Sequence, residues 1–262
     1  MDLNLSGKPV IVCASSAGLG KAAALEFARE GANVMLSGRR EKELALAVAE
    51  IRDQTGREAK YTVADVTNPA DVDRLVAAAV KEFGGVYTLV NNSGGPPAGT
   101  FDSFDDAAWQ KAFELNLLSY VRTIRAALPH MRRTGGGRIV NYASSSVKSP
   151  LDNLILSNTF RLGVAGLTKT LAGELGRDGI LINVQAPGRI QTERIEQLDA
   201  IRASKAGSTP EQVRLDACRT IPLGRYGRPE EFAKLTVFLG SPANTYLTGQ
   251  SVLVDGGMVK AY

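Results

Sequence analysis

The 262-residue chain is poor in the side chains that bind metals or form disulfides. Its two cysteines, Cys13 and Cys218, are far apart, and His130 is its single histidine. Two distant thiols without a metal-binding spacing indicate a reduced, cytoplasmic protein, and one histidine cannot build a metal site alone. We therefore expect a cytoplasmic location and no metal ion, and we interpret His130 as a structural residue near a helix end.

Long apolar runs and blocks of like charge are missing too. No segment approaches the roughly 20 apolar residues that cross a bilayer, and Met1-Asp2-Leu3-Asn4 lacks the basic start of a secretion signal. The net charge is +4, and the basic residues are scattered along the chain. This pattern favours a mild attraction to an anionic cofactor over nucleic-acid binding, and we expect neither a membrane nor a nucleic-acid partner.

Along the chain, short apolar segments alternate with segments whose apolar residues recur with helical periodicity. With 44% hydrophobic and 22% charged residues, the composition is that of a globular protein. The predicted strands are 9–13, 33–37, 60–64, 87–91, 138–142, 180–185 and 250–254. The predicted helices are 18–30, 41–54, 69–83, 105–133, 152–176 and 230–239. Strands separated by helices predict a single-domain α/β fold, a doubly wound sheet of seven parallel strands.

One segment, at about 190–222, breaks this rhythm, because it is polar and helix-prone but contains no strand. In an open α/β sheet a ligand binds beyond the carboxyl ends of the strands. An insertion directly after the sixth strand could therefore cover a ligand as a lid. The alternative is a simple surface excursion.

A glycine-containing turn follows the first predicted strand, in Cys13-Ala14-Ser15-Ser16-Ala17-Gly18-Leu19-Gly20. Glycines let the backbone approach a pyrophosphate, and the next helix offers free N–H groups and a positive dipole end. Taken alone, the turn is a weak signal, because turns with two glycines have many structural uses.

Further motifs make the chain resemble the short-chain dehydrogenase/reductase superfamily, with its Rossmann-like fold, over essentially all 262 residues. That family has Thr-Gly-x-x-x-Gly-x-Gly at the first turn, Asn-Asn-Ala-Gly after the fourth strand, and a Pro-Gly after the sixth with a Thr four residues later. The matching residues here are Asn91-Asn92-Ser93-Gly94, Pro187-Gly188 and Thr192. The C-terminal segments 224–231 and 247–257 resemble 3-oxoacyl-acyl-carrier-protein reductases. The turn departs from the pattern, because Cys13 and Ala14 replace its Thr and first Gly.

The resemblance implies a dinucleotide site. Its expected residues are Ser15, Ser16, Gly18, Leu19, Gly20, Asp65, Val66, Asn92, Gly94, Pro187, Gly188, Ile190 and Thr192, with Asp65 beside the adenine. NAD-type sites carry a carboxylate at the end of the second strand. This chain has Gly38-Arg39-Arg40 there. Because guanidinium groups suit a 2′-phosphate, we expect NADP(H) to be favoured over NAD(H); otherwise Arg39 and Arg40 only cap the next helix.

The family's catalytic residues are Asn, Ser, Tyr and Lys, and the resemblance places the first two at Asn116 and Ser144. The spacing from Ser144 and the downstream segment 166–172 both put Ser157 at the Tyr position and Arg161 at the Lys position. A serine hydroxyl is a much weaker acid than a phenol and needs another base to exchange protons. Arg161 keeps a cation one helical turn from Ser157. Tyr142 or Lys148 could contribute, although a packed strand aromatic is the favoured interpretation of Tyr142.

Three functions remain open. The first is an oxidoreductase that reduces a small-molecule or acyl-carrier-linked carbonyl, such as a 3-oxoacyl thioester, with NADPH. The second is a catalytically impaired protein that binds a dinucleotide or metabolite as a sensor or scaffold. The third is a non-redox lyase or isomerase in the same pocket. The chain is also expected to form a homotetramer or homodimer, because the helices at 105–133 and 152–176 are apolar on more than one face.

Overall fold

In the computed structural model, which describes residues 1–261, seven parallel strands form one sheet in the order β3-β2-β1-β4-β5-β6-β7. The strands are β1 (Pro9–Val12), β2 (Asn33–Gly38), β3 (Lys60–Val63), β4 (Thr88–Asn91), β5 (Gly137–Tyr142), β6 (Ile180–Pro187) and β7 (Ser251–Val254). The order reverses at β1, where β2 and β4 both pair with it. The prediction of seven parallel strands is confirmed.

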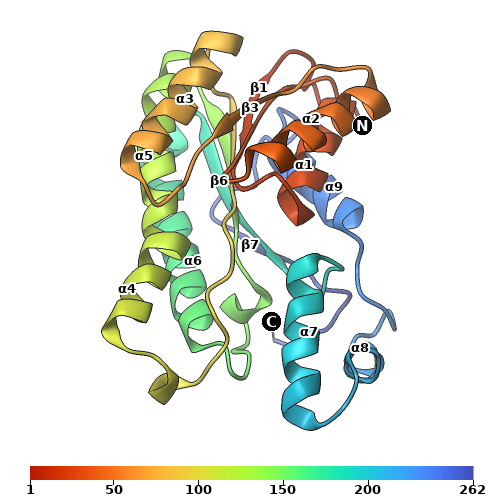
Figure 1. Cartoon of the computed structure of the whole chain (residues 1–262). Helices are drawn as coiled ribbons and strands as arrows, with labels where there is room; N and C mark the ends of the chain where they lie inside the picture. The colour runs from red at the N-terminus through yellow and green to blue at the C-terminus, as the bar shows by residue number, and fades with distance from the viewer. Residues whose placement is uncertain (262) are drawn as a thin grey trace.

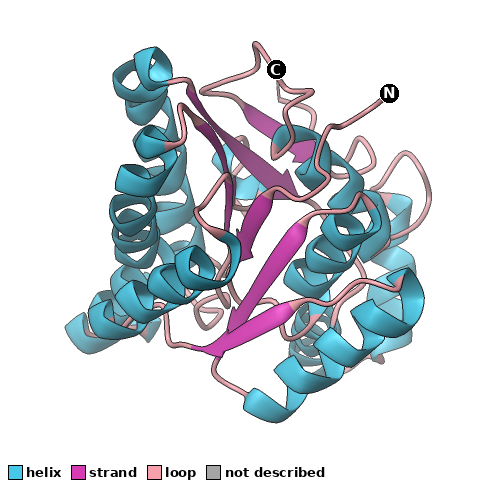
Figure 2. Ribbon diagram, turned by 90° about the horizontal axis from the view of Figure 1, so that it is seen from above, coloured by secondary structure: helices cyan, strands magenta, loops and turns pink. Residues whose placement is uncertain are grey.

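Helices cover both faces of the sheet (Figures 1 and 2). The helices are α1 (Gly18–Arg29), α2 (Glu41–Thr55), α3 (Pro69–Phe83), α4 (Asp106–Phe113), α5 (Ser119–Arg133), α6 (Ile155–Leu175), α7 (Glu193–Ala206), α8 (Pro210–Arg219) and α9 (Pro229–Leu239). One core lies under α1, α2 and α9, and it includes Phe27 and Phe232. The other core lies under α3, α5 and α6, and it includes Leu89 and Ile139. Within the described chain, no helix is long and apolar enough to cross a membrane.

Local signals explain where several of these helices begin and end. For α3, the Asn68 side chain accepts a hydrogen bond from the Ala70 backbone N–H, Pro69 occupies the first turn, and Gly84 ends the helix in the left-handed conformation. A cap of this kind satisfies backbone N–H groups that have no partner within the helix. The predicted bounds of α3 are therefore confirmed at both ends.

Two predicted helices need correction. The helix expected over 105–133 is interrupted by a π-helical turn at Glu114–Leu118, between α4 and α5. The helix expected to begin at Asp152 begins at Ile155 instead. Asn153 has a φ of 58°, which a right-handed helix does not accommodate, and Leu154 forms an isolated β-bridge with Gly99. Tertiary pairing therefore shortens this helix by one turn.

The segment at about 190–222 forms α7 and α8, which pack against each other. Both lie at one end of the sheet, apart from the helices that cover its faces (Figure 1). This placement agrees with an insertion beyond the carboxyl end of β6. Whether it moves as a lid stays a prediction.

Candidate active site

The turn between β1 and α1 has a strained and crowded backbone. Ala14 has a φ of 46° and Gly18 a φ of 57°, both in the left-handed region. For Ala14 this conformation costs about 1 kcal/mol, because its Cβ approaches the following carbonyl. A Cβ on Gly20 would lie 2.4 Å from the Ala14 carbonyl oxygen. Gly20 is therefore required by the close approach of α1 to the turn.

The N-terminus of α1 is free to meet an anion. Ala17 at the N-cap has no side-chain cap, and no acidic residue lies in the first turn. The N–H groups of this turn, together with the positive end of the helix dipole, suit a phosphate. The Asn92 side chain supports the turn, because its Nδ2 donates a hydrogen bond to the Ala14 carbonyl at 3.1 Å.

A cavity of about 480 Å³ lies beside this turn at the carboxyl ends of the central strands. It is lined by most of the predicted cofactor residues: Gly18, Leu19, Asn92, Gly94, Pro187, Gly188, Ile190 and Thr192. The predicted catalytic residues Ser144, Ser157 and Arg161 line it too. Segments more than 100 residues apart along the chain thus meet at one cavity.

The remaining predicted cofactor residues lie outside the lining of this cavity. The Ser15 side chain is fully buried and donates its hydroxyl to the Val12 carbonyl at 2.7 Å, so it supports the turn. Arg39 is 76% exposed, with Nη1 4.0 Å from a carboxylate oxygen of Asp65. Arg40 forms an ion pair with Glu43, in which Nη1 lies 3.3 Å from Oε1. The others in this group are Ser16, Gly20 and Val66. Since β2 and β3 pair side by side, Arg39 and Asp65 lie at one edge beyond their carboxyl ends.

Arg161, on α6, is the most deeply buried cation at the cavity, with 6% of the residue exposed. Its Nη1 donates to the Tyr120 hydroxyl at 2.8 Å and to the Tyr142 carbonyl at 2.9 Å. Its Nη2 lies 3.5 Å from both the carbonyl and the hydroxyl oxygen of Ser93. Several neutral acceptors thus hold the guanidinium, which a buried charge requires.

Two of these partners, Ser93 and Tyr120, were not expected from the sequence. Ser93 stands where the resembled family has Ala, and its hydroxyl gives the guanidinium an extra acceptor. Tyr120 lies one helical turn after Asn116, a spacing that could have pointed to it. Its hydroxyl accepts from Arg161 and donates to the Tyr142 carbonyl at 2.8 Å. The surroundings of Arg161 therefore fit an arginine.

The two predicted catalytic serines differ in their local contacts. The Ser144 hydroxyl oxygen accepts a hydrogen bond from the Ser146 backbone N–H at 3.2 Å, which leaves its O–H available. Ser157 is half-buried at the cavity. The next residue, Asn158, exchanges hydrogen bonds with the Leu151 backbone, and Phe160 packs against Trp109 and Phe113. Residues flanking Ser157 on α6 are thus held by packing.

Asn116 is fully buried in the π-helical turn and does not line the cavity. Its Nδ2 donates to the Ala112 carbonyl at 3.2 Å, and its Oδ1 has no partner within residues 1–261. A buried amide oxygen without a partner is unfavourable unless water fills the site. The structure therefore places Asn116 outside the cavity lining.

The two additional candidates for proton transfer are poorly placed. The Tyr142 hydroxyl is hydrogen-bonded to Thr236 on α9 at 2.8 Å, and burial raises the pKa of its phenol well above the ordinary value. Lys148 is exposed and outside the cavity lining. The simpler interpretation of Tyr142 as a packed strand aromatic thus agrees with its surroundings.

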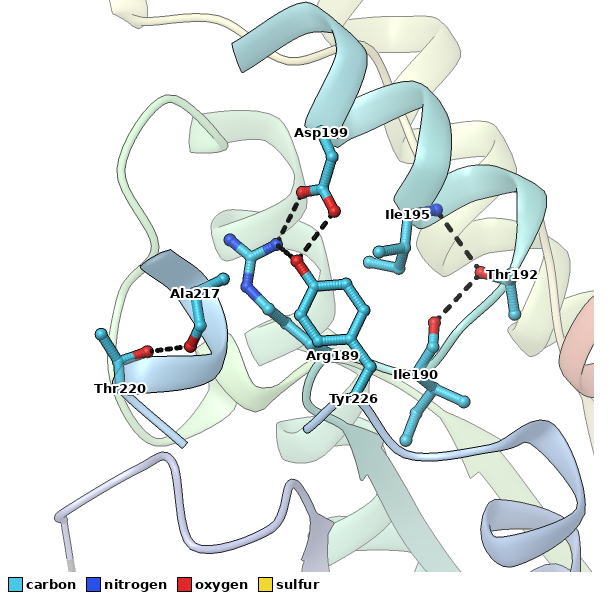
Figure 3. A network of polar contacts seen from close by, with 8 residues as sticks. All are labelled: Arg189, Ile190, Thr192, Ile195, Asp199, Ala217, Thr220 and Tyr226. Atoms are coloured by element: carbon cyan, nitrogen blue, oxygen red, sulfur yellow. Dashed lines mark hydrogen bonds and ion pairs between the residues drawn. The ribbon is translucent and has the colours of Figure 1, made fainter. Parts of the chain in front are cut away.

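A polar network joins α7 to the loop after β6 (Figure 3). Arg189 forms an ion pair with the buried Asp199 at 2.8 Å, and the Tyr226 hydroxyl donates to the second Asp199 oxygen at 2.8 Å. Nearby, the Thr192 hydroxyl accepts from the Ile195 N–H at 3.4 Å and caps α7. These contacts fix the α7 face that borders the cavity.

The surroundings of Cys13 and His130 do not favour a catalytic role for either side chain. Burial raises the pKa of the Cys13 thiol to about 12, which keeps it protonated and unreactive. Burial and the nearby Arg133 charge lower the pKa of His130, which lies on α5 away from the cavity lining. The described residues contain no cluster of three or more potential metal ligands.

Comparisons with known proteins agree on one family. A sequence model described as Enoyl-(Acyl carrier protein) reductase matches residues 13–259. The chain is 36% identical over 247 residues to the short-chain reductase protein NovJ of Streptomyces niveus, covering 94% of this chain and 92% of that protein. It is 34% identical over 259 residues to the 3-oxoacyl-[acyl-carrier-protein] reductase FabG of Thermotoga maritima, covering 98% of this chain and all of that protein.

Solved structures give the same result. L-sorbose reductase from Gluconobacter frateurii, complexed with NADPH and L-sorbose, superposes with a TM-score of 0.94 at 33% identity, with full coverage of both chains. Actinorhodin polyketide ketoreductase with NADPH gives a TM-score of 0.92 at 31% identity, covering 96% of this chain and 97% of that one.

Proposed function

Because the chain belongs to the short-chain dehydrogenase/reductase superfamily of oxidoreductases, we propose that it reduces a carbonyl group with NADPH. The observation that carries the proposal is that Ser144, Ser157 and Arg161 share one cavity with the turn before α1. Relatives that carry the names of ketone-, ketose- or 3-oxoacyl-reducing enzymes support a carbonyl substrate, either a small molecule or an acyl group on a carrier.

The residues around the cavity fit a nicotinamide dinucleotide. The uncapped N-terminus of α1 suits the pyrophosphate, and Gly94 has no atom within 4 Å of where a Cβ would lie, which leaves open space beside it. In this assignment Thr192, Ile190 and Gly188 border the cofactor from the β6 side, while Asp65 and Val66 border the adenine. The bound cofactor would supply the hydride.

The side chains of this chain would then stabilise the oxygen of the substrate. As hydride reaches the carbonyl carbon, negative charge develops on the oxygen, and preorganised donors stabilise that charge. Ser144 and Ser157 would each donate a hydrogen bond to it, and the nearby Arg161 cation favours it electrostatically. A serine is too weak an acid to deliver the proton on its own, so a water molecule in the cavity would donate the proton to the alkoxide oxygen.

The alternative is a protein that binds the dinucleotide without turnover. It is favoured by the lack of a phenol at Ser157, since a missing general acid typically costs roughly 10²–10⁴ in rate. The non-redox lyase or isomerase has no comparable observation in its favour. The cavity itself fits both the reductase and the binding protein, so the two must be separated by experiment.

A panel of carbonyl compounds with NADPH tests the proposal. We expect oxidation of NADPH in the presence of at least one 3-oxoacyl thioester, cyclic ketone or ketose, followed by its absorbance. The Ser144→Ala variant should still bind NADPH in calorimetry but turn over more slowly, because only a donor to the substrate is lost. NADPH binding with no turnover across the panel would reject the reductase and favour the binding protein.

Cofactor preference should depend on Arg39. The double variant Gly38→Asp, Arg39→Leu is expected to reverse the preference from NADP(H) to NAD(H), with the ratio of the two Kd values changing by about tenfold or more. The new carboxylate would bind a 2′-hydroxyl and repel a 2′-phosphate. A Cβ at Gly38 meets Ser16 Oγ at 3.4 Å, so it fits. Kd values by calorimetry check this.

Arg52→Leu is the control for cofactor preference, because Arg52 is an exposed arginine on α2 that pairs with Asp53. It should leave the Kd ratio unchanged. If the Kd ratio is also unchanged in the Gly38→Asp, Arg39→Leu variant, Arg39 is a solvated surface residue that does not bind the cofactor.

Assembly into a homotetramer or homodimer, and a cytoplasmic location, stay part of the proposal. Leu162 on α6 is 55% exposed, and Leu118 and Val121 are half-buried, so an apolar surface remains on these helices. Val164 on the same helix α6 is fully buried within the chain. The surface available for a partner is therefore narrower than the sequence suggests.

A further inference from the structure

Helix α7 presents two arginines to the cavity. Arg194, Leu198 and Arg202 follow one another at intervals of four residues, and all three line the cavity. This spacing places them on one face of the helix. The same face thus offers two cations with an apolar side chain between them.

Arg194 reaches across the cavity to the loop after β4. Its Nη2 donates to the Pro96 carbonyl at 2.6 Å. A Cβ on Gly95 would lie 3.2 Å from both Nε and Nη2, so this glycine makes room for the guanidinium. A guanidinium has five N–H donors, and this contact uses one of them. The rest of the group remains able to bind an acceptor in the cavity.

The positive charge at this end of the cavity has no counter-charge. Within residues 1–261, no carboxylate forms an ion pair with Arg161, Arg194 or Arg202. Asp199, the buried carboxylate of α7, is already paired with Arg189 (Figure 3). Glu193 lines the cavity but is exposed and forms no ion pair with these groups. Burial, and then the charge of Arg161, lower the pKa of Arg194, so the two cations disfavour each other.

The phosphates of the cofactor do not account for these cations in the arrangement proposed above. The pyrophosphate takes the N-terminus of α1, and the 2′-phosphate takes the edge beside Arg39. Arg161 and Arg194 instead bind backbone oxygens of Ser93 and Pro96, three residues apart in one loop. Their surplus charge is therefore left for the second ligand of the cavity, which is the substrate.

We propose that Arg194 binds a carboxylate of the substrate, so that the preferred substrates are oxo acids. The inference rests on the proposed function and adds the substrate class. The guanidinium fork matches a carboxylate in two parallel hydrogen bonds. Arg194 and Arg161 contact the same short loop and line the same cavity as Ser144 and Ser157, so one substrate can present its carboxylate to Arg194 and its carbonyl to the serines. Arg194 thereby also orients the carbonyl for hydride transfer.

The test compares straight-chain oxo acids of four to eight carbons with their methyl esters. Wild-type protein with NADPH should reduce at least one acid with a kcat/KM about 10- to 100-fold above that of its ester, the range expected for hydrogen bonds to a charged group. Arg194→Gln should lower kcat/KM for the acid much more than for the ester, and so remove this advantage. Lys205→Gln is the matched control, because Lys205 is an exposed cation of the same helix outside the cavity lining.

The other possible results distinguish a failure of the carboxylate site from a failure of the proposed function. Esters reduced as well as acids by the wild type would overturn the inference and leave the proposed function standing. An equal loss of NADPH affinity and acid turnover in Arg194→Gln would also overturn it, because Arg194 would then serve the cofactor. If neither acid nor ester is reduced, the carbonyl panel above decides on the proposed function, and calorimetry with the same acids decides on the carboxylate site. Binding to wild type that Arg194→Gln abolishes supports the carboxylate site, and absence of binding rejects it.

Discussion

Replacing Arg161 with methionine is expected to lower kcat/KM for carbonyl reduction by about a hundredfold or more. The guanidinium is the most deeply buried cation at the cavity, and loss of one preorganised stabilising group typically costs about 10²–10³ in rate. Folding should survive, because the Tyr142 carbonyl keeps its hydrogen bond from the Tyr120 hydroxyl. Methionine also fills much of the same space. Steady-state kinetics and chemical denaturation measure the two effects separately.

Arg161→Lys is the informative companion to this variant. It keeps the charge but loses the fork that reaches Tyr120, Tyr142 and Ser93 together. We expect a smaller loss of kcat/KM than with methionine. If Arg161→Met keeps its rate within about threefold of the wild type while folding normally, then Arg161 is a structural cation and takes no part in the reaction.

The second expected result is that the double variant Ser157→Tyr, Arg161→Lys does not gain activity. It restores the Tyr and Lys of the resembled family in register with Ser144. The surroundings, however, are built for the present residues. Phe160 is held between Trp109 and Phe113, and Ser93 gives Arg161 an acceptor where the family has Ala. A phenol in place of the Ser157 hydroxymethyl group would also occupy part of the cavity in which the substrate is proposed to bind.

Rates for the wild type, both single variants and the double variant decide this point. The double variant should stay at or below the wild-type rate. A gain of about a hundredfold or more, on the scale of a recovered general acid, would contradict this expectation. It would mean that the chain is a reductase that simply lost its Tyr and Lys, with the rest of the site unchanged.

Most of the fold could be predicted from the sequence because its signals are local. Short apolar segments, helical periods and turn residues such as Asn68, Pro69 and Gly84 lie within a few residues of the structure that they specify. The same holds for the turn before α1, whose two glycines and missing Gly at position 14 are readable directly. The register from Ser144 to Ser157 and Arg161 is likewise a matter of counting along the chain.

The features that only the tertiary structure decided depend on contacts between residues that are distant in sequence. Arg161 meets Tyr120 across 41 residues and Ser93 across 68, and no periodicity encodes such contacts. Helix α6 begins at Ile155 and not at the predicted Asp152, because Leu154 pairs with Gly99. The sequence shows Arg194 only as one of several basic residues after β6. In the structure the Arg194 side chain is half-buried beside Gly95 and Pro96, and the pairing of Asp199 with Arg189 leaves it without a counter-ion.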